Sequence, residues 1–253
     1  KKRKIKLSFR SIQVIWIKEL KAYFNSPVAY IITSLFLALS GLSFALSITG
    51  RFPEASMRGF LFGPIGPIGA FFLIVLIAPL LTMRLFAEEQ KLGTLELLLT
   101  APLRDIEIVL GKFLAALSLL TAMFCLTLYF PLLLYWFGDP DLLPILTGYL
   151  GLFLMGAMGV SVGLFSSSLT SNQIVSAVVA TATLLLLWLF NVTSTLGDGE
   201  LPWASLVRFL AISEHVRDMA YGVIDSRDIV YFISITAFFL FLTVRAVETR
   251  RWK

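Results

Sequence analysis

Long apolar runs alternate with short polar segments along this chain and predict six membrane-spanning helices. Each run is close to, or longer than, the roughly 20 residues that a helix needs to cross a bilayer. The third run is long enough to project from the membrane or to break at Pro131. We therefore expect an all-α polytopic membrane protein with a single membrane domain over residues 1–253. The spans are expected at residues 28–48, 65–82, 106–137, 142–165, 174–196 and 229–247.

A shorter pattern at residues 9–23 predicts an amphipathic helix ahead of the first span. Its apolar residues recur at spacings of three and four, and basic residues fall between them. The segment is too short and too charged to cross a bilayer, so we expect it to lie in the cytoplasmic interface. The turn Asn25-Ser26-Pro27 then leads the chain into the membrane.

The connection at residues 197–228 is expected to fold into two short helices that close the outer end of the bundle. The stretches from Trp203 to Ser213 and from Glu214 to Gly222 both carry an amphipathic pattern. Large apolar side chains would not stay in water there, because burying each one gains roughly 1.5–3 kcal/mol. We expect this loop to act as an outer gate, with Trp203, Phe209, His215 and Tyr221 as its principal residues.

Composition supports a membrane protein and orients it in the bilayer. The chain is 58% hydrophobic and only 15% charged, against about 25% charged residues in soluble domains. Sixteen Lys and Arg residues fall on the side of the chain termini, and five fall on the other side. Basic residues favour the cytoplasmic side. We therefore expect a plasma-membrane protein, in the bacterial inner membrane, with both termini on the cytoplasmic side. The net charge of +5 comes from these anchors and does not indicate nucleic-acid binding.

Several chemistries are not expected in this chain. The single Gly-Lys pair, Gly111-Lys112, has Ile106 where a phosphate-binding loop needs glycine. One histidine and one cysteine do not support a metal cluster or a disulfide. Within the expected bounds no span core carries an ionisable residue, which argues against ion-coupled transport. We expect no catalytic, cofactor or metal site here, and therefore not an enzyme.

The polar stretch after the second span predicts a further amphipathic helix, at residues 88–101. Glu88, Glu89, Lys91 and Glu96 alternate with leucines at helical spacing, and Pro102 ends the helix. Gly93-Thr94 offers a bend or a cap. The pattern alone is explained equally well by a solvated interfacial helix and by one that docks into another protein.

The run TMRLFAEEQKLGTLELLLTAP, from Thr82 to Pro102, resembles the EEKxxGTxExLLxxP segment of ABC-2-type transporter permeases. The resemblance covers nearly the whole chain and includes WIKEL at Trp16–Leu20 and SPVAY at Ser26–Tyr30. Gln90 departs from the commoner basic residue of the motif. HVRDMAYGVIDSRD (residues 215–228) and VRAVETRRW (residues 244–252) are most similar to the gliding-motility-type permeases. Six residues match the motif: Glu88, Glu89, Gly93, Thr94, Glu96 and Pro102.

The resemblance implies a type V exporter-like fold and the permease subunit of an ATP-driven exporter. Residues 88–101 would be its coupling helix, which enters a cleft on a separate ABC ATPase subunit that binds ATP and Mg. Two permease subunits, identical or related, would line the path through the bilayer. The ATPase-coupling residues would be the six motif residues together with Lys91.

Two other functions fit the same residues. The chain could be a mechanical module that passes ATPase-driven motion through residues 197–228 to an extracytoplasmic accessory protein, without moving a substrate. It could also be a channel or lipid scaffold without an ATPase. Gly159 and Gly163 form a small-xxx-small pair in the fourth span, and they suit packing within the subunit and between subunits equally well.

Overall fold

The computed structural model describes residues 9–49, 57–63, 69–94, 103–138, 140–196 and 209–250, and the regular structure in these ranges is helical. The helices are α1 (Phe9–Phe24), α2 (Pro27–Thr49), α3 (Arg58–Phe62), α4 (Ala70–Thr82), α5 (Arg84–Lys91), α7 (Asp105–Leu126), α8 (Tyr129–Phe137), α9 (Leu142–Leu169), α10 (Gln173–Leu196), α12 (Ile212–Ala220) and α13 (Ser226–Arg250).

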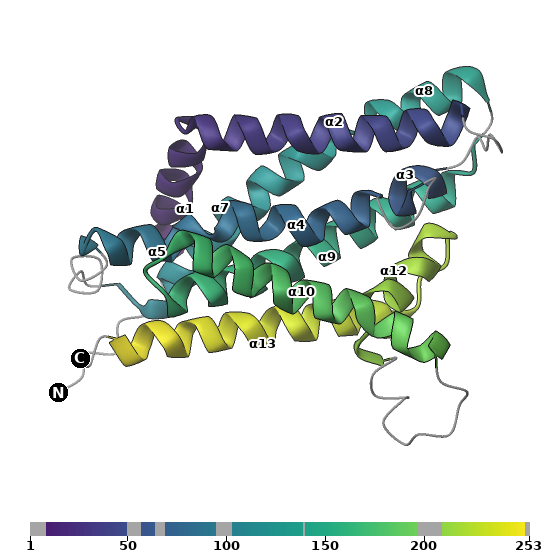
Figure 1. Ribbon diagram of the computed structural model, residues 1–253. Coiled ribbons are helices and arrows are strands. Elements are labelled where there is room, and N and C mark those ends of the chain that lie inside the picture. Colours follow the sequence, from purple (N-terminus) through teal and green to yellow (C-terminus); the bar gives the residue numbers. More distant parts are fainter. Residues whose placement is uncertain are drawn as a thin grey trace.

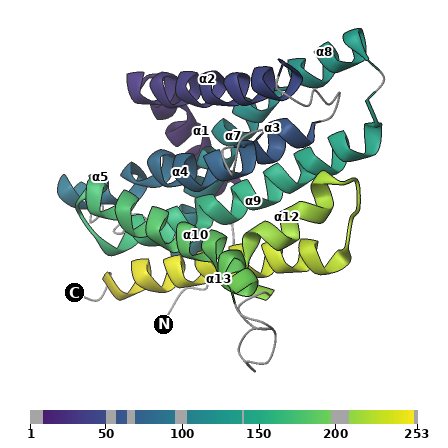
Figure 2. The same cartoon turned by 45° about the vertical axis from the view of Figure 1, so that its right-hand side comes forward.

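The six expected spans are present in the structure. Six helical segments are long and apolar enough to cross a bilayer, and two of them combine α4 with α5 and α7 with α8. Figure 1 shows the spans running side by side, with α1 crossing them at one end of the bundle. We call this end the α1 end; it also holds α5 and the last turns of α13. The opposite end, with α3 and α12, is the α12 end (Figures 1 and 2). The chain is thus an all-α, multi-pass membrane protein.

Two spans differ in shape from the prediction. The second span does not stop at Thr82, because α5 continues it to Lys91 after a break at Met83. The third span breaks between α7 and α8, at Thr127 and Leu128, rather than at Pro131 itself. A proline clashes with the carbonyl four residues before it and lacks the N–H that would bond there. For Pro131 that position is Thr127, so the break lies one turn ahead of the proline.

The central helix α9 packs closely on its neighbours through small residues. A Cβ atom at Gly159 would lie 2.9 Å from the Cβ atom of Ala78 in α4. At Gly163 it would collide with the Thr82 side chain, also in α4. The structure thus places both glycines against another helix of the same subunit. Gly156 in turn faces Leu120 of α7, so α9 fixes the second and third spans together.

The outward faces of α2, α10 and α13 carry exposed large apolar side chains. Ile31, Val178 and Phe238 are examples from the three helices, and each is more than half exposed. In water such a surface would be unfavourable, whereas lipid chains or a second subunit would cover it. The outward faces of these three helices are therefore suited to contact with lipid or with a second subunit.

Candidate functional site

The break between α4 and α5 is made by a hydroxyl group from α9. The Ser167 Oγ accepts hydrogen bonds from the backbone N–H groups of Phe86 and Ala87, each at 3.0 Å, and donates to the carbonyl of Met83 at 3.0 Å. In an uninterrupted helix those two amides would bond to carbonyls one turn earlier. A side chain inserted into this ladder bends the helix. Ser167 thereby caps α5 from another helix.

A buried lysine from α7 holds the other side of α5. The Lys112 ammonium is fully buried, and its Nζ lies 2.8 Å from Glu89 Oε1, 3.1 Å from Glu19 Oε1 and 2.7 Å from the carbonyl oxygen of Leu85. The ammonium donates hydrogen bonds to Glu19 and to the Leu85 carbonyl, and it forms an ion pair with Glu89. Glu19 belongs to α1 and the other two partners to α5. Lys112 therefore joins three helices through one charged group.

The two carboxylates around Lys112 are balanced by a second lysine. Lys18 Nζ lies 3.6 Å from Glu19 and 3.8 Å from Glu89, with its side chain 64% exposed. We call Lys18, Glu19, Glu89 and Lys112 the Lys112 cluster; it holds two positive and two negative charges. Gly111 allows α1 to approach, since a Cβ atom there would lie 2.7 Å from Ile15.

Further polar contacts secure the α1 end. The Arg84 guanidinium donates to Ser26 Oγ at 2.7 Å and pairs with Glu88 at 3.3 Å. The Gln90 amide donates to the carbonyls of Ser167 and Ser168. The Tyr23 hydroxyl donates to the carbonyl of Leu81 at 2.7 Å, and burial raises the pKa of Tyr23 well above its ordinary value. The inward-facing residues of α5 between Arg84 and Gln90, which we call the root of the helix, are thus bonded to α1, α7 and α9.

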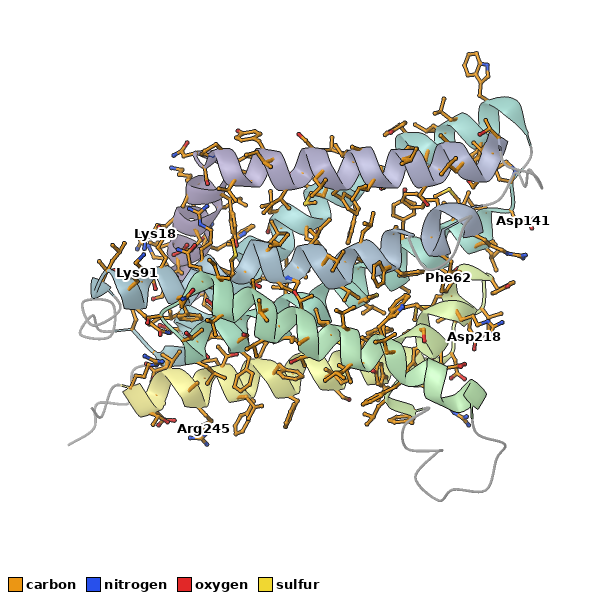
Figure 3. All side chains as sticks on the ribbon, in the orientation of Figure 1. Lys18, Phe62, Lys91, Asp141, Asp218 and Arg245 are labelled. Carbon is orange, nitrogen blue, oxygen red and sulfur yellow. The ribbon has the colours of Figure 1, made fainter. Side chains whose placement is uncertain are left out.

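The residues expected to couple to an ATPase fall into separate environments. Glu89 turns inward to Lys112, with its side chain only 16% exposed, whereas Glu88 is 41% exposed. Lys91 and Leu92 are exposed at the tip of α5 (Figure 3 labels Lys91). Gly93, with φ +70°, follows the helix end.

The expected separate helix at 88–101 therefore differs at its start. Its first residues belong to α5, which continues the second span. The Thr94 hydroxyl bonds back to the carbonyl of Glu89 at 3.4 Å. Glu96 and Pro102 lie outside the described residues.

At the α12 end the structure brings Phe209 and His215 together. His215 Nδ1 lies 2.7 Å from Asp228 Oδ1, and its Nε2 lies 2.9 Å from the carbonyl oxygen of Phe209. The imidazole stacks on Tyr231 with 3.9 Å between ring centroids, and Phe209 meets it edge-on. Asp228 and Tyr231 belong to α13, so this cluster ties α12 to the start of the last span.

The other expected gate residues do not join this cluster. Tyr221 lies beneath the guanidinium of Arg58, 4.3 Å from the ring centroid, and thus contacts α3. Trp203 lies outside the described residues. The α12 helix packs mainly on α9, where the Thr147 hydroxyl donates to the carbonyl of Met219. The Met219 sulfur would lie 3.0 Å from a Cβ atom at Gly151. In the described residues α12 is a packed helix supported by three spans.

Three residues that organise these sites were missed by reasoning from the sequence: Lys112, Ser167 and Asp228. Lys112 counted as one of the basic residues near a span end and as part of the rejected Gly111-Lys112 pair. It lies within the expected third span and is buried there, so the expectation that no span core carries an ionisable residue was wrong. A signal for it existed, because it is the one charged residue of α7 beyond the first turn, and Glu19 is the one acidic residue of α1. An isolated lysine in one apolar helix and an isolated glutamate in another suggest a pair. Ser167 carries no comparable signal.

The cap from Ser167 generates a stability prediction. Replacing Ser167→Ala leaves the amides of Phe86 and Ala87 without their acceptor, so the free energy of unfolding should fall by about 1–2 kcal/mol. Ser168→Ala is the matched control, because the Ser168 hydroxyl is also buried but bonds only to Phe165 within its own helix. Denaturant titration of the purified protein in detergent compares the two. Equal losses in both variants would contradict the assigned role of Ser167.

A family model described as ABC-2 family transporter protein matches residues 13–199. The match includes α5 and the whole Lys112 cluster, and covers most of the chain. It ends before the residues that carry the likeness to gliding-motility-type permeases, so that subtype stays a prediction. A search of curated proteins finds no match. The chain is a member of the ABC-2 transporter family, whose members are membrane-spanning permease subunits.

Proposed function

We propose that this chain is the permease subunit of an ATP-driven exporter, and that the tip of α5 with the residues after it docks on a separate ATPase subunit. The ATPase would bind ATP and Mg, and two permease subunits, identical or related, would form the path. One observation supports this most directly: the root of α5 is bonded to three other helices, while its tip is exposed. Force applied to the tip would therefore reach the spans.

The tip of α5 has the character of a protein-binding surface. Leu92 is 67% exposed beside the exposed Lys91 and the half-exposed Glu88. An apolar side chain surrounded by charged ones suits the centre and rim of a protein interface. Gly93 ends the helix there with a left-handed φ of +70°, so the chain leaves α5 in a new direction. These features favour docking over simple solvation.

The α1 end is proposed to lie on the cytoplasmic side of a bacterial inner membrane. The sequence assigns sixteen of the 21 basic residues to segments on the side of the chain termini, and α1 and α5, which belong to these segments, lie at this end (Figure 1). Basic residues are retained on the cytoplasmic side. An ATPase in the cytoplasm would then meet the tip of α5. The α12 end would face the extracytoplasmic side.

The proposed partner can be tested with a matched pair of charge reversals. Glu88 and Glu248 both lie at the α1 end, are 41% and 42% exposed, and pair with an arginine of their own helix. The tagged wild-type chain should co-purify an ATPase with a phosphate-binding loop. Glu88→Lys should weaken this binding about tenfold, equivalent to ~1.4 kcal/mol, and Glu248→Lys should not.

Binding would be quantified with the purified ATPase and permease in detergent. Absence of any ATPase from the wild-type preparation would contradict the partner. Equal binding by the two variants would indicate that the docking surface does not include Glu88 of α5.

The proposed orientation predicts a labelling pattern. In a Cys125→Ala background, a cysteine at Asp141 should react with a membrane-impermeant maleimide added to intact cells, and a cysteine at Lys91 should not. Figure 3 places these two residues at opposite ends of the bundle. Permeabilised cells provide the control, since both positions should then react. Reaction at position 91 in intact cells would contradict the proposed orientation and place the α1 end outside the cell.

The α12 helix is proposed to serve as the outer gate of the path. Its support by α9, α10 and α13 would hold the gate closed at rest. Movement of these spans would displace it.

Weakening the gate should raise leak. Phe209 packs edge-on against His215 and Tyr231, so Phe209→Ser removes contacts from the cluster that holds α12. Val223→Ser is the control, because both side chains are 56% exposed at the same end. Release of a trapped dye from proteoliposomes should rise for the first variant only. No difference between the two variants would argue against the gate.

A further inference from the structure

Lys112 lies where a charge is difficult to keep. It is in the third span, about two turns beyond the start of α7 at Asp105, and its side chain is 1% exposed. A lysine at such a position is unfavourable unless acceptors surround it. The structure supplies two hydrogen-bond acceptors, Glu19 and the Leu85 carbonyl, and an ion pair with Glu89, all from α1 and α5. Through these contacts Lys112 can transmit motion between the helices.

The two bonds from Lys112 to α5 lie beyond the break in the second span. Leu85 and Glu89 both follow Met83, the residue at which the inserted Ser167 hydroxyl separates α4 from α5. If α5 tilted about this break, it would pull Lys112 and therefore α7. Glu19 is bonded to the same ammonium, so α1 would follow. Span two is therefore not the only route by which motion of α5 can spread.

We propose that Lys112 is a positioning residue that makes α1, α5 and α7 move as one body. A displacement of the α5 tip would then reach the third span and the interfacial helix together. The source of that displacement rests on the proposed ATPase. The connection of the three helices through Lys112, which we call the joint, is a property of this chain alone. Charge is central to it: without the Lys112 ammonium, the carboxylates of Glu19 and Glu89 would have only the exposed Lys18 between them, and their repulsion would be less well balanced.

The opposite view is that Lys112 only stabilises the fold. The two views differ in what happens to the spacing of helices after the charge is removed. If the Lys112 cluster is a joint, removal of the ammonium separates α1 from α5 in a protein that still assembles. If it is only a stabilising contact, the folded protein keeps its spacing and only its unfolding changes.

The experiment measures the distance between α1 and α5. Spin labels are attached to cysteines at Lys21 and Lys91, both exposed, in a Cys125→Ala background, and the permease is placed in lipid nanodiscs. Pulsed electron paramagnetic resonance should give one narrow distance distribution for the wild-type cluster. Lys112→Met should broaden or shift it, and Lys112→Arg should restore the narrow peak because the positive charge and donors remain.

Two further variants sharpen the comparison. Lys18→Met removes the exposed lysine of the same cluster and should leave the distribution narrow. Glu89→Gln keeps the size of the side chain and removes the α5 carboxylate that pairs with Lys112, so it should broaden the distribution. It serves as the test if Lys112→Met fails to fold. A distribution that is unchanged in Lys112→Met or Glu89→Gln, or already broad in the wild type, overturns the joint.

The joint and the proposed function can fail separately. The distribution of the permease alone tests the joint without any ATPase. With the ATPase bound, ATP and Mg should leave the distance between positions 21 and 91 unchanged, because the three helices move together. A nucleotide-dependent change in this distance would overturn the one-body proposal even if the ATPase binds. A narrow distribution in a chain that binds no ATPase would be consistent with the joint and would contradict the proposed partner.

Discussion

A polar group that enters a bilayer must find its hydrogen-bond partner inside the protein, because lipid chains offer none. This constraint explains most of the polar contacts between the helices described above. The Lys112 ammonium has two hydrogen-bond acceptors and an ion pair with Glu89, and the Ser167 hydroxyl has two donors and one acceptor. Both groups connect segments far apart in sequence. Hydroxyl groups that join no other helix, such as Thr33 and Thr236, bond to the carbonyl four residues earlier. For Lys112 and Ser167, satisfying a polar group and joining helices are therefore the same event.

The helix α9 connects the two sites. Its 28 residues span about 40 Å, with Ser167 near one end and Thr147 near the other. Ser167 holds α5 and Thr147 holds α12. Between them Gly159 and Gly163 bring α4 within direct contact. A change in the tilt of α9 would therefore be felt at both ends of the bundle, as the proposed outer gate would require.

Much of the fold follows from local rules, and much of the site does not. The six spans are evident because apolar runs of sufficient length have one outcome in a membrane protein. The break at Thr127 could have been derived from Pro131 by the geometry of proline. The break at Met83 could not, because its cause is a hydroxyl more than 80 residues later in the chain.

Glu89 illustrates the limit of the amphipathic pattern. The pattern groups it with Glu88 on a polar face, and this is correct as far as one helix is concerned. It does not say whether that face meets water or a buried cation. Lys112 and Glu19 decide the matter, and neither is a neighbour in sequence. At the α12 end, likewise, the pairing of His215 with Asp228 depends on how α12 returns to α13.

The way in which Lys112 is held has a chemical consequence. Its side chain donates to Glu19 and to the carbonyl of Leu85 and pairs with Glu89, so its polar contacts are taken up within the protein. The most buried lysine among the described residues therefore faces other groups of the chain and presents no free charge to a solute. If a substrate crosses the membrane as proposed, Lys112 would not select it by charge.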